Sequence, residues 1–223
     1  PSKCTVNSAE GVAAVASFLG VDAGSEEKRI ARLACHGGRN VARFQADYQG
    51  QASCRAAVAA GGGGKACRWG CLGLADCETS CTFDAIHMNE QGLPVVDPEK
   101  CVACNDCVLA CPLDLFSLLP VSQKLFVACK SLAEGDQALS ECEVACTACG
   151  RCAADAPDGL ISIENNLAVI DRSKNHLASR YPIERCPTGA IGWFEGGTFH
   201  KGAAAKKIIR KEPLPILSEL TSP

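Results

Sequence analysis

The sequence predicts an α+β fold of small tandem modules, with a short α/β segment before them and an extended tail after them. Two observations lead to this prediction. Cysteine accounts for 17 of the 223 residues, and most of these cysteines are separated by only two or three residues. From Cys67 onward, a cysteine-bearing turn, a stretch of small residues and a short hairpin recur as one unit. The period is roughly 30 to 40 residues, which indicates duplication.

Composition narrows the class of protein. The apolar content of 47% is enough for a core, while the net charge of -3 and the pI of about 5.8 argue against a general nucleic-acid or membrane-surface binder. The chain shows no secretory signal and no apolar run near the roughly 18 residues of a membrane span. Closely spaced cysteines in such a chain indicate metal-binding thiolates rather than disulfides, and a cytoplasmic location.

The first 66 residues differ from the rest. Their patterns predict a helix over 9–19, a strand over 30–35, helices over 41–48 and 54–60, and a flexible glycine hinge at 61–64. The glycine run is not a phosphate loop, because Ala59 and Ala66 stand where that motif needs glycine and Ser or Thr.

Four hairpins follow, joined by turn residues. They are expected at 86–88 with 93–96, 115–119 with 124–127, 160–163 with 167–170, and 191–194 with 198–200. The pairing of units predicts one module over 67–128 and a second over 129–202. Residues 203–223 form the tail, which begins with a basic, helix-prone stretch at 203–211. The tail is more apolar than a free tail needs, so we expect it to dock on a partner.

The strongest motif is a run of four cysteines with spacings of two, two and three residues, ending in Cys111-Pro112. Bacterial ferredoxins carry this run, in which three thiolates bind one [4Fe–4S] cluster and the fourth binds another. A tight loop lets three sulfurs reach one cube, and proline suits the turn that follows. The predicted modules are therefore tandem ferredoxin-like (4Fe-4S) modules.

A partner run lies upstream, but Leu74 stands where its second ligand should be. We expect Cys67 to supply that ligand instead. The first predicted ligand set is then Cys67, Cys71, Cys77 and Cys111. The second predicted ligand set is Cys81, Cys101, Cys104 and Cys107.

The last two units keep one ligand set and lose another. By register, the lost positions are Ala156, Asn175, Ala178 and Tyr181. In a two-cluster pair these four positions are the complete ligand set of one cluster, so the pattern indicates that one cluster is deleted and one retained. The retained, third set is Cys146, Cys149, Cys152 and Cys186.

Five cysteines remain, namely Cys4, Cys35, Cys54, Cys129 and Cys142. Cys129 and Cys142 align roughly with Cys35 and Cys67 in the duplication. Spare thiols, buried as small apolar side chains, are the simpler interpretation, and a further cluster is the alternative. His36 is the only histidine beside a cysteine, and we interpret it as structural. The sequence thus predicts three [4Fe–4S] clusters and leaves room for a further one.

Residues 65–86 (KACRWGCLGLADCETSCTFDAI) and 99–112 (EKCVACNDCVLACP) closely resemble the B subunit of the Rnf complex, a membrane ferredoxin:NAD oxidoreductase that couples electron flow to ion pumping. The likeness extends through 29–35 and 160–170 and covers roughly residues 4–192. It implies an electron-transfer subunit with [4Fe–4S] clusters. By the same resemblance, Cys4 is the last ligand of an upstream cluster whose other three cysteines would precede Pro1.

The predicted function is therefore the relay of electrons between ferredoxin, or another redox partner, and a further subunit of an Rnf-type complex. No dinucleotide fingerprint, catalytic triad or open metal site is evident, so we expect a non-catalytic subunit. The expected partners are the other subunits, soluble ferredoxin and a protein that binds the tail, but no nucleic acid. The expected location is cytoplasmic, with attachment to the inner face of the membrane through partner subunits.

Two alternatives stay open. A polyferredoxin subunit of a soluble oxidoreductase, with its tail strapped onto a catalytic subunit, would use the same cluster motifs. A zinc-binding interaction module would also use closely spaced cysteines, although the Cys-Pro ends and the crossed ligand pairing argue against it.

Overall fold

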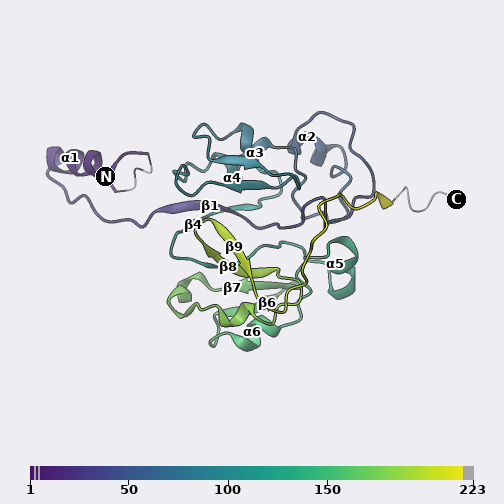
Figure 1. Ribbon diagram of the computed structural model, residues 1–223. Helices are drawn as coiled ribbons and strands as arrows, with labels where there is room; N and C mark the ends of the chain where they lie inside the picture. The colour runs from purple at the N-terminus through teal and green to yellow at the C-terminus, as the bar shows by residue number, and fades with distance from the viewer. Residues whose placement is uncertain (3, 5, 218–223) are drawn as a thin grey trace.

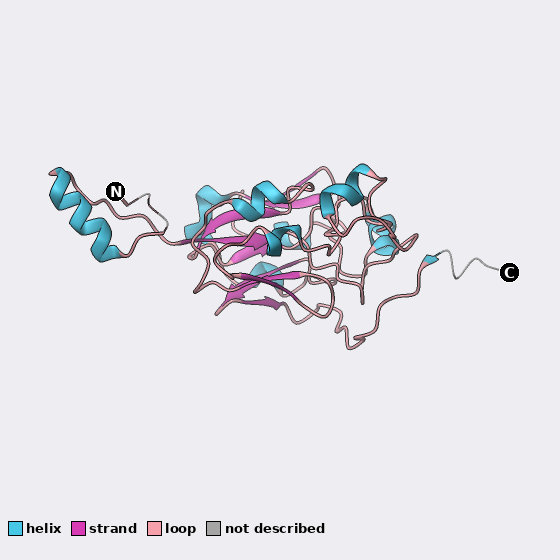
Figure 2. Ribbon diagram, turned by 90° about the horizontal axis from the view of Figure 1, so that it is seen from above, coloured by secondary structure: helices cyan, strands magenta, loops and turns pink. Residues whose placement is uncertain are grey.

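The computed structural model describes residues 1–2, 4 and 6–217, and it shows an N-terminal arm beside a larger body (Figure 1). The arm carries α1 (Ala9–Leu19), which begins after Ser8, whose hydroxyl accepts the amide of Gly11 at 3.1 Å. It ends at Gly20, whose positive φ suits a helix C-terminus. Seen from above, α1 stands clear of the body at the end of an extended segment (Figure 2). The predicted helix over 9–19 is confirmed.

The body mixes short helices with small antiparallel sheets, as the α+β prediction expects. In the upper part of Figure 1, β1 (Arg29–Leu33) pairs with β4 (Phe116–Pro120), and β2 (Ile86–Met88) pairs with β3 (Pro94–Val96). In the lower part, β8 (Ile191–Glu195) lies between β5 (Leu125–Val127) and β9 (Thr198–Lys201). There too, β6 (Ile161–Glu164) pairs with β7 (Leu167–Ile170).

The helices of the body are short. They are α2 (Cys54–Ala59), α3 (Asp76–Thr79), α4 (Asp106–Ala110), α5 (Gly135–Glu141) and α6 (Arg151–Asp155). Two 3-10 turns follow, η1 (Arg172–Leu177) and η2 (Tyr181–Ile183). Helices this short have little stability of their own, so packing must hold them in place.

Buried clusters supply that packing, and the two largest include cysteine thiols. The upper core packs Ile86, Leu115 and Phe116 around the thiols of Cys71, Cys77, Cys101 and Cys107. The lower core packs Leu125, Leu160, Ile183 and Ile191 around the thiols of Cys146, Cys152 and Cys186. Thiols in such surroundings are shielded from water on most sides.

Three predicted elements differ in the structure. Residues 115–119 and 124–127 do not form a hairpin, because β4 pairs with β1 and β5 pairs with β8. The helix predicted over 41–48 is absent from these described residues. Their backbone pairs with a distant segment instead: the amide of Gln45 donates to the carbonyl of Gly64, and the amide of Ala66 donates to the carbonyl of Arg43. The basic stretch at 203–211 forms a turn at 203–205 followed by irregular backbone, and no helix.

The glycine run at 61–64 is packed into this arrangement. Gly64 has a φ of 76°, and a Cβ at this position would lie 2.1 Å from the carbonyl oxygen of Ala46. The residue must therefore be glycine so that the two backbone segments can approach. This part of the run is a packed crossing and not the hinge that the sequence suggests.

The described part of the tail packs along the surface of the body. Figure 1 shows it rising from the lower to the upper part of the body. The amide of Lys206 donates to the carbonyl of Pro187, and the amide of Leu214 donates to the carbonyl of Arg39, both at 2.9 Å. The Arg210 guanidinium reaches the carbonyl of Asn40 at 2.7 Å and the carboxylate of Glu143 at 2.9 Å. Residues 203–217 therefore strap the two parts of the body together, and docking of the tail on a partner stays a prediction.

Candidate iron–sulfur sites

Three loops carry the cysteines of the ferredoxin-type runs, at 71–77, 101–107 and 146–152. Each loop leads into a short helix, so that Cys77, Cys107 and Cys152 occupy the second positions of α3, α4 and α6. In each loop, two residues have positive φ, in the pairs Gly73 and Ala75, Ala103 and Asn105, and Ala148 and Gly150. Backbone that alternates in this way turns successive N–H groups toward one concave side, which suits an anionic group.

The second predicted ligand set surrounds one small cavity of about 20 Å³, which Cys81, Cys101, Cys104 and Cys107 line together. The amide of Ala85 donates to the sulfur of Cys81 at 3.4 Å, and the amide of Ala31 donates to the sulfur of Cys101 at 3.5 Å. Ala31 belongs to β1, so the N-terminal segment closes this site. Burial, with smaller contributions from the neighbouring thiols, raises the pKa of the Cys107 thiol to about 12.

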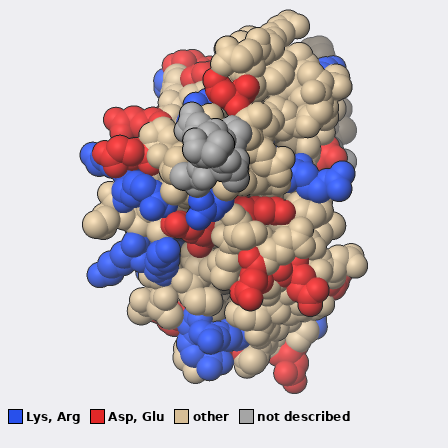
Figure 3. Space-filling view, turned by 90° about the vertical axis from the view of Figure 1, so that its right-hand side faces the viewer, with Lys and Arg blue, Asp and Glu red and all other residues tan. Residues whose placement is uncertain are grey.

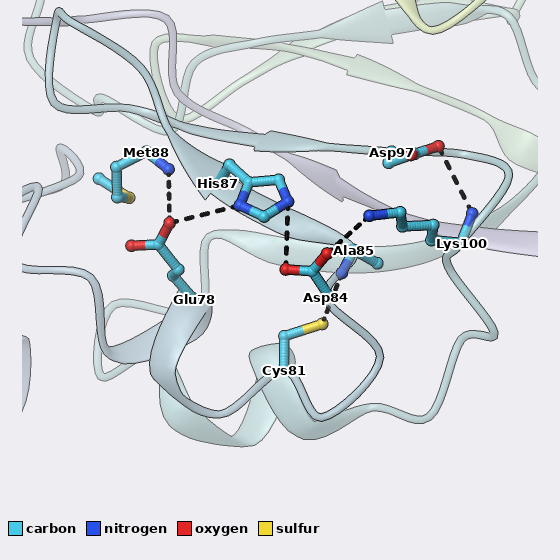
Figure 4. A network of polar contacts seen from close by, with 8 residues as sticks. All are labelled: Glu78, Cys81, Asp84, Ala85, His87, Met88, Asp97 and Lys100. Carbon is cyan, nitrogen blue, oxygen red and sulfur yellow. Dashed lines mark hydrogen bonds and ion pairs between the residues drawn. The ribbon is translucent and has the colours of Figure 1, made fainter.

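A network of polar side chains fixes the loop of Cys81 from the outside (Figure 4). The His87 ring lies between the carboxylates of Glu78 and Asp84, at 3.8 and 3.4 Å. Lys100 forms an ion pair with Asp84 at 2.6 Å, and Glu78 also accepts the amide of Met88 at 3.0 Å. These bonds tie α3 to β2 on either side of the turn that holds Cys81.

The third predicted set surrounds a second cavity of about 20 Å³, lined by Cys146, Cys149, Cys152 and Cys186. Burial raises the pKa of the Cys152 thiol to about 12. The sulfur of Cys186 lies 3.8 Å from the hydroxyl of Thr188. Beside it, Arg185 bonds both carboxylate oxygens of Asp155 at 2.5 and 2.7 Å, which fixes the segment before Cys186 against α6.

The first predicted set is only partly brought together. Burial, with smaller contributions from the nearby thiols of Cys71, Cys54 and Cys111, raises the pKa of the Cys77 thiol to about 12, so these four thiols are neighbours. Cys67 is not among them. Cys54, at the first position of α2, lies beside Cys77 where the sequence predicts Cys67.

Cys54 reaches this position because α2 packs beside the 71–77 loop, in which Leu74 occupies a ligand position. The backbone of Asp76 and Leu74 hydrogen-bonds its thiol, while burial raises its pKa. The hydroxyl of Ser53 also donates to the carboxylate of Asp76 at 3.0 Å. The sequence does not place Cys54 beside Cys77, because Cys54 lies before the glycine run, with no short-range spacing to Cys71. The gap at Leu74 was the available signal that one ligand comes from elsewhere.

Cys67 lines a separate cavity with Cys35, Cys129 and Cys142. Cys4, the last of the cysteines outside the predicted sets, is exposed in the arm. All of the cysteines are free thiols, and no three Cys, His, Asp or Glu side chains in the described residues are close enough to hold one metal ion. Thiols grouped around a cavity, but too far apart for one ion, suit the larger cube of an iron–sulfur cluster.

The surface and the helices add two observations. On the face that carries part of the tail, acidic and basic side chains are interspersed (Figure 3), so this face has no field of a single sign. None of the helices in the described ranges is long and apolar enough to cross a bilayer.

Comparison with known proteins identifies similar chains. A family described as a 4Fe-4S binding domain matches residues 93–116. The chain is 42% identical over 188 residues to the B subunit of the Na(+)-translocating ferredoxin:NAD(+) oxidoreductase complex of Acetobacterium woodii. That match covers 84% of this chain and 56% of the relative, so the chain spans little more than half of that protein.

Two further relatives are matched over more of their length. The B subunit of the proton-translocating ferredoxin:NAD(+) oxidoreductase complex of Clostridium ljungdahlii is 39% identical over 199 residues, which are 89% of this chain and 70% of the relative. The B subunit of the ion-translocating oxidoreductase complex of Methanosarcina acetivorans is 34% identical over 190 residues, which are 85% of this chain and 72% of the relative.

Proposed function

The chain belongs to the family of B subunits of ion-translocating ferredoxin:NAD oxidoreductase (Rnf) complexes, and on this premise we propose that it is an electron-transfer subunit that holds several [4Fe–4S] clusters. The observation that carries the proposal is the burial of cysteine thiols in groups of four around small cavities, with backbone amides directed at their sulfurs. Electrons would pass from ferredoxin, or another redox partner, to a further subunit of the complex.

The proposed ligands form three sets of the ferredoxin type. They are Cys54, Cys71, Cys77 and Cys111 for the first, Cys81, Cys101, Cys104 and Cys107 for the second, and Cys146, Cys149, Cys152 and Cys186 for the third. The first set departs from the sequence expectation at Cys67, for which Cys54 is substituted because its thiol neighbours Cys77 and Cys111.

These sets divide between two proposed ferredoxin-like modules, residues 67–128 and 129–202, although β5, at the end of the first range, pairs with β8 of the second. The N-terminal segment supports the first module, because β1 pairs with β4 and covers the second ligand set. In the second module, η1 and η2 occupy the segment where a further cluster is predicted to be deleted, and Pro182 and Ile183 fill it with buried apolar atoms.

A bound [4Fe–4S] cluster supplies one-electron exchange in which no bond to substrate forms or breaks. The chain's own residues set how readily that exchange occurs. Apolar neighbours such as Leu115 and Leu160 exclude water, and amides such as those of Ala31 and Ala85 stabilise negative charge on sulfur. The thiols must lose their protons to bind iron. Burial opposes this loss because it raises their pKa values.

The partners in this proposal are the other subunits of the complex and a soluble ferredoxin, with attachment to the inner face of the membrane through those subunits. For the tail, we propose that residues 203–217 act mainly as an internal strap, since Arg210 and Leu214 bond to the body. Ile209, which is 93% exposed, is the part of the strap that is available to a partner.

The test begins with anaerobically purified protein. Iron, sulfide and zinc per chain are measured, together with an EPR spectrum after reduction by dithionite. The proposal expects about four irons and four sulfides for each ligand set, with interacting signals of reduced clusters. Zinc in place of iron would sink the electron-transfer function and leave a structural zinc module.

A ligand variant sharpens the result. Cys107→Ser should remove about four irons from the chain, because it leaves the second set with three thiolates. Ser140→Ala, on the exposed surface of α5, is the control and should keep the full iron content. Assembly is tested by purification from membranes, where the native protein should co-purify with the other subunits. A native complex that lacks them would favour the soluble oxidoreductase instead.

A further inference from the structure

Four cysteines outside the three ligand sets line a cavity of their own. This cavity measures about 20 Å³, which equals the volumes of the cavities in the second and third sets. It lies between the two parts of the body, and each part contributes two thiols. The four thiols belong to Cys35, Cys67, Cys129 and Cys142, of which Cys129 is partly buried and the other three are buried.

The two pairs of thiols are equivalent by position. Cys35 stands two residues after the end of β1, and Cys129 stands two residues after the end of β5. Cys67 and Cys142 each precede a ligand-loop cysteine, Cys71 or Cys146, by four residues. The cavity is therefore built from the same pair of positions in each half of the duplication.

The hydrogen bonds repeat the same equivalence. The amide of Cys71 donates to the sulfur of Cys35 at 3.4 Å, and the amide of Cys146 donates to the sulfur of Cys129 at 3.4 Å. The ligand loops of the first and third sets are thus hydrogen-bonded to thiols that line this cavity. Two matching amide–sulfur bonds across a duplication are expected of a preserved site and not of spare thiols.

Three of the four thiols also sit in the local geometry of a cluster ligand. Cys67, Cys129 and Cys142 each accept the amide of the residue two positions later, as Cys104 and Cys146 do in the ferredoxin-type loops. Amides aimed at sulfur stabilise thiolates that carry the charge of a cluster.

Glycine keeps the space between two of these sulfurs. A Cβ at Gly37 would lie 3.0 Å from the sulfur of Cys142 and 3.7 Å from that of Cys35. Any side chain at this position would press on the thiols from the edge of the cavity.

A buried cation provides an independent observation. Lys65 lines the cavity and is 7% exposed, and its ammonium donates to the carbonyls of Gly37 at 2.5 Å and Cys71 at 2.6 Å. Among the described residues it forms no ion pair. A buried charge without a counter-charge is unfavourable, so the cavity calls for an anionic occupant. A [4Fe–4S] core with four thiolates carries net negative charge and would supply it.

We propose that Cys35, Cys67, Cys129 and Cys142 hold a fourth [4Fe–4S] cluster between the two halves of the body, an inference that rests on the proposed electron-transfer function. The site joins the first and third ligand sets through Cys71 and Cys146, so it lies on the route between the modules. One electron enters and one electron leaves, and no atom is transferred. With Cys54 in the first set, every cysteine except Cys4 then has a place in a set of four.

The experiment compares iron and sulfide contents of the full chain, purified anaerobically, by chemical assay and native mass spectrometry. The wild type should hold about sixteen irons. Cys142→Ser, Cys67→Ser and the double variant should each hold about twelve, because all three lose the same cluster. The double variant Cys54→Ser with Cys67→Ser should hold about eight, because its two substitutions affect different clusters. Ser140→Ala, two residues from Cys142, should match the wild type.

The outcomes separate this inference from the proposed function. A wild type with about twelve irons, unchanged by Cys142→Ser, would overturn the fourth site while the three ferredoxin-type sets stand. A loss of only four irons in the Cys54→Ser and Cys67→Ser double variant would also overturn it, by returning Cys67 to the first set. A chain without iron would refute the proposed function itself. Where a variant fails to fold, as judged by circular dichroism, the wild-type count of twelve or sixteen still decides.

Discussion

At the residue scale, the ligand loops depend on backbone conformations that most side chains avoid. Ala75, Ala103 and Ala148 all have positive φ, between 54° and 65°. Such conformations cost an alanine on the order of 1 kcal/mol each, so the surrounding structure must hold them. The same conformation in all three loops indicates that they are built to present the same ligand geometry, even where a ligand is missing at Leu74.

A rescue experiment tests whether the three loops, which share one backbone conformation, also present their ligands in the same way. Cys54→Ser should remove about four irons from the first set. Adding Leu74→Cys should restore them, because the new thiol would stand between Gly73 and Ala75 as Cys104 stands between Ala103 and Asn105. Iron content and the EPR spectrum of the double variant measure the rescue. A double variant that stays four irons short would show that position 74 does not face the cluster.

The positive charge of Lys65 should raise the reduction potential of a cluster held in the cavity that this side chain lines. Lys65→Gln removes a positive charge beside the cavity between the modules, which favours the oxidised form of a cluster held there. At an effective dielectric constant of about 20, Coulomb's law gives on the order of 1–2 kcal/mol, or roughly 50–100 mV lower for one electron. A redox titration followed by EPR makes the measurement. The exposed Lys207→Gln is the control, and an equal shift in both variants would contradict the assignment.

At the element scale, the strands β4 and β5 decide how the two parts of the body join. Each pairs outside the predicted hairpin, and their side chains meet in one small apolar cluster that includes Leu119, Phe126 and Ala128. The ring of Phe126 packs edge-on against that of Phe194 at 5.6 Å, and Phe194 packs in the same way against Phe199 at 5.1 Å. This cluster lies between the upper and lower cores.

Truncation of Phe126 should therefore weaken the junction. Phe126→Ala should lower the free energy of unfolding by about 3–5 kcal/mol, as large-to-small substitutions of buried aromatic rings do. Phe126→Leu, which keeps much of the volume, should cost less than half as much. Anaerobic denaturant titration followed by circular dichroism would measure both. Equal stabilities for the two variants would mean that the ring does not pack as described.

At the scale of the whole molecule, the tail fastens the two parts of the body. Arg210→Ala removes the bonds to Asn40 and Glu143 and should lower the free energy of unfolding by about 1–2 kcal/mol, because the pair is partly exposed. Thermal unfolding under anaerobic conditions measures the loss. Arg172→Ala, which alters an exposed side chain, is the control. No difference between the two variants would show that the strap adds nothing to stability.

The clusters themselves should hold the fold together. The thiols form a large part of both cores, and the helices and sheets around them are too short to be stable alone. Removal of iron by acid and chelator should abolish the protected core, seen as rapid proteolysis of the whole body. Reconstitution with iron and sulfide should reverse the change. An iron-free chain that resists protease as the native protein does would contradict this dependence.

The sequence by itself determined the local features of this protein. The amphipathic pattern of 9–19, the hairpins around 86–96, 160–170 and 191–200, and the ferredoxin-type run that ends in Cys111 all depend on residues near one another in the chain. Local spacing is sufficient there, because a tight turn or a three-cysteine loop is made from consecutive residues.

The tertiary structure alone decided which distant residues meet. Cys54 lies beside Cys77, β1 closes the site of Cys101, and Cys35 meets Cys142 between the two parts of the body. These contacts depend on how the strands pair and how α2 packs against a loop, and neither is encoded in short-range spacing. The tail likewise becomes a strap because the body offers backbone partners along its path. Long-range convergence of this kind is settled by packing, since a chain with many thiols can pair them in many ways.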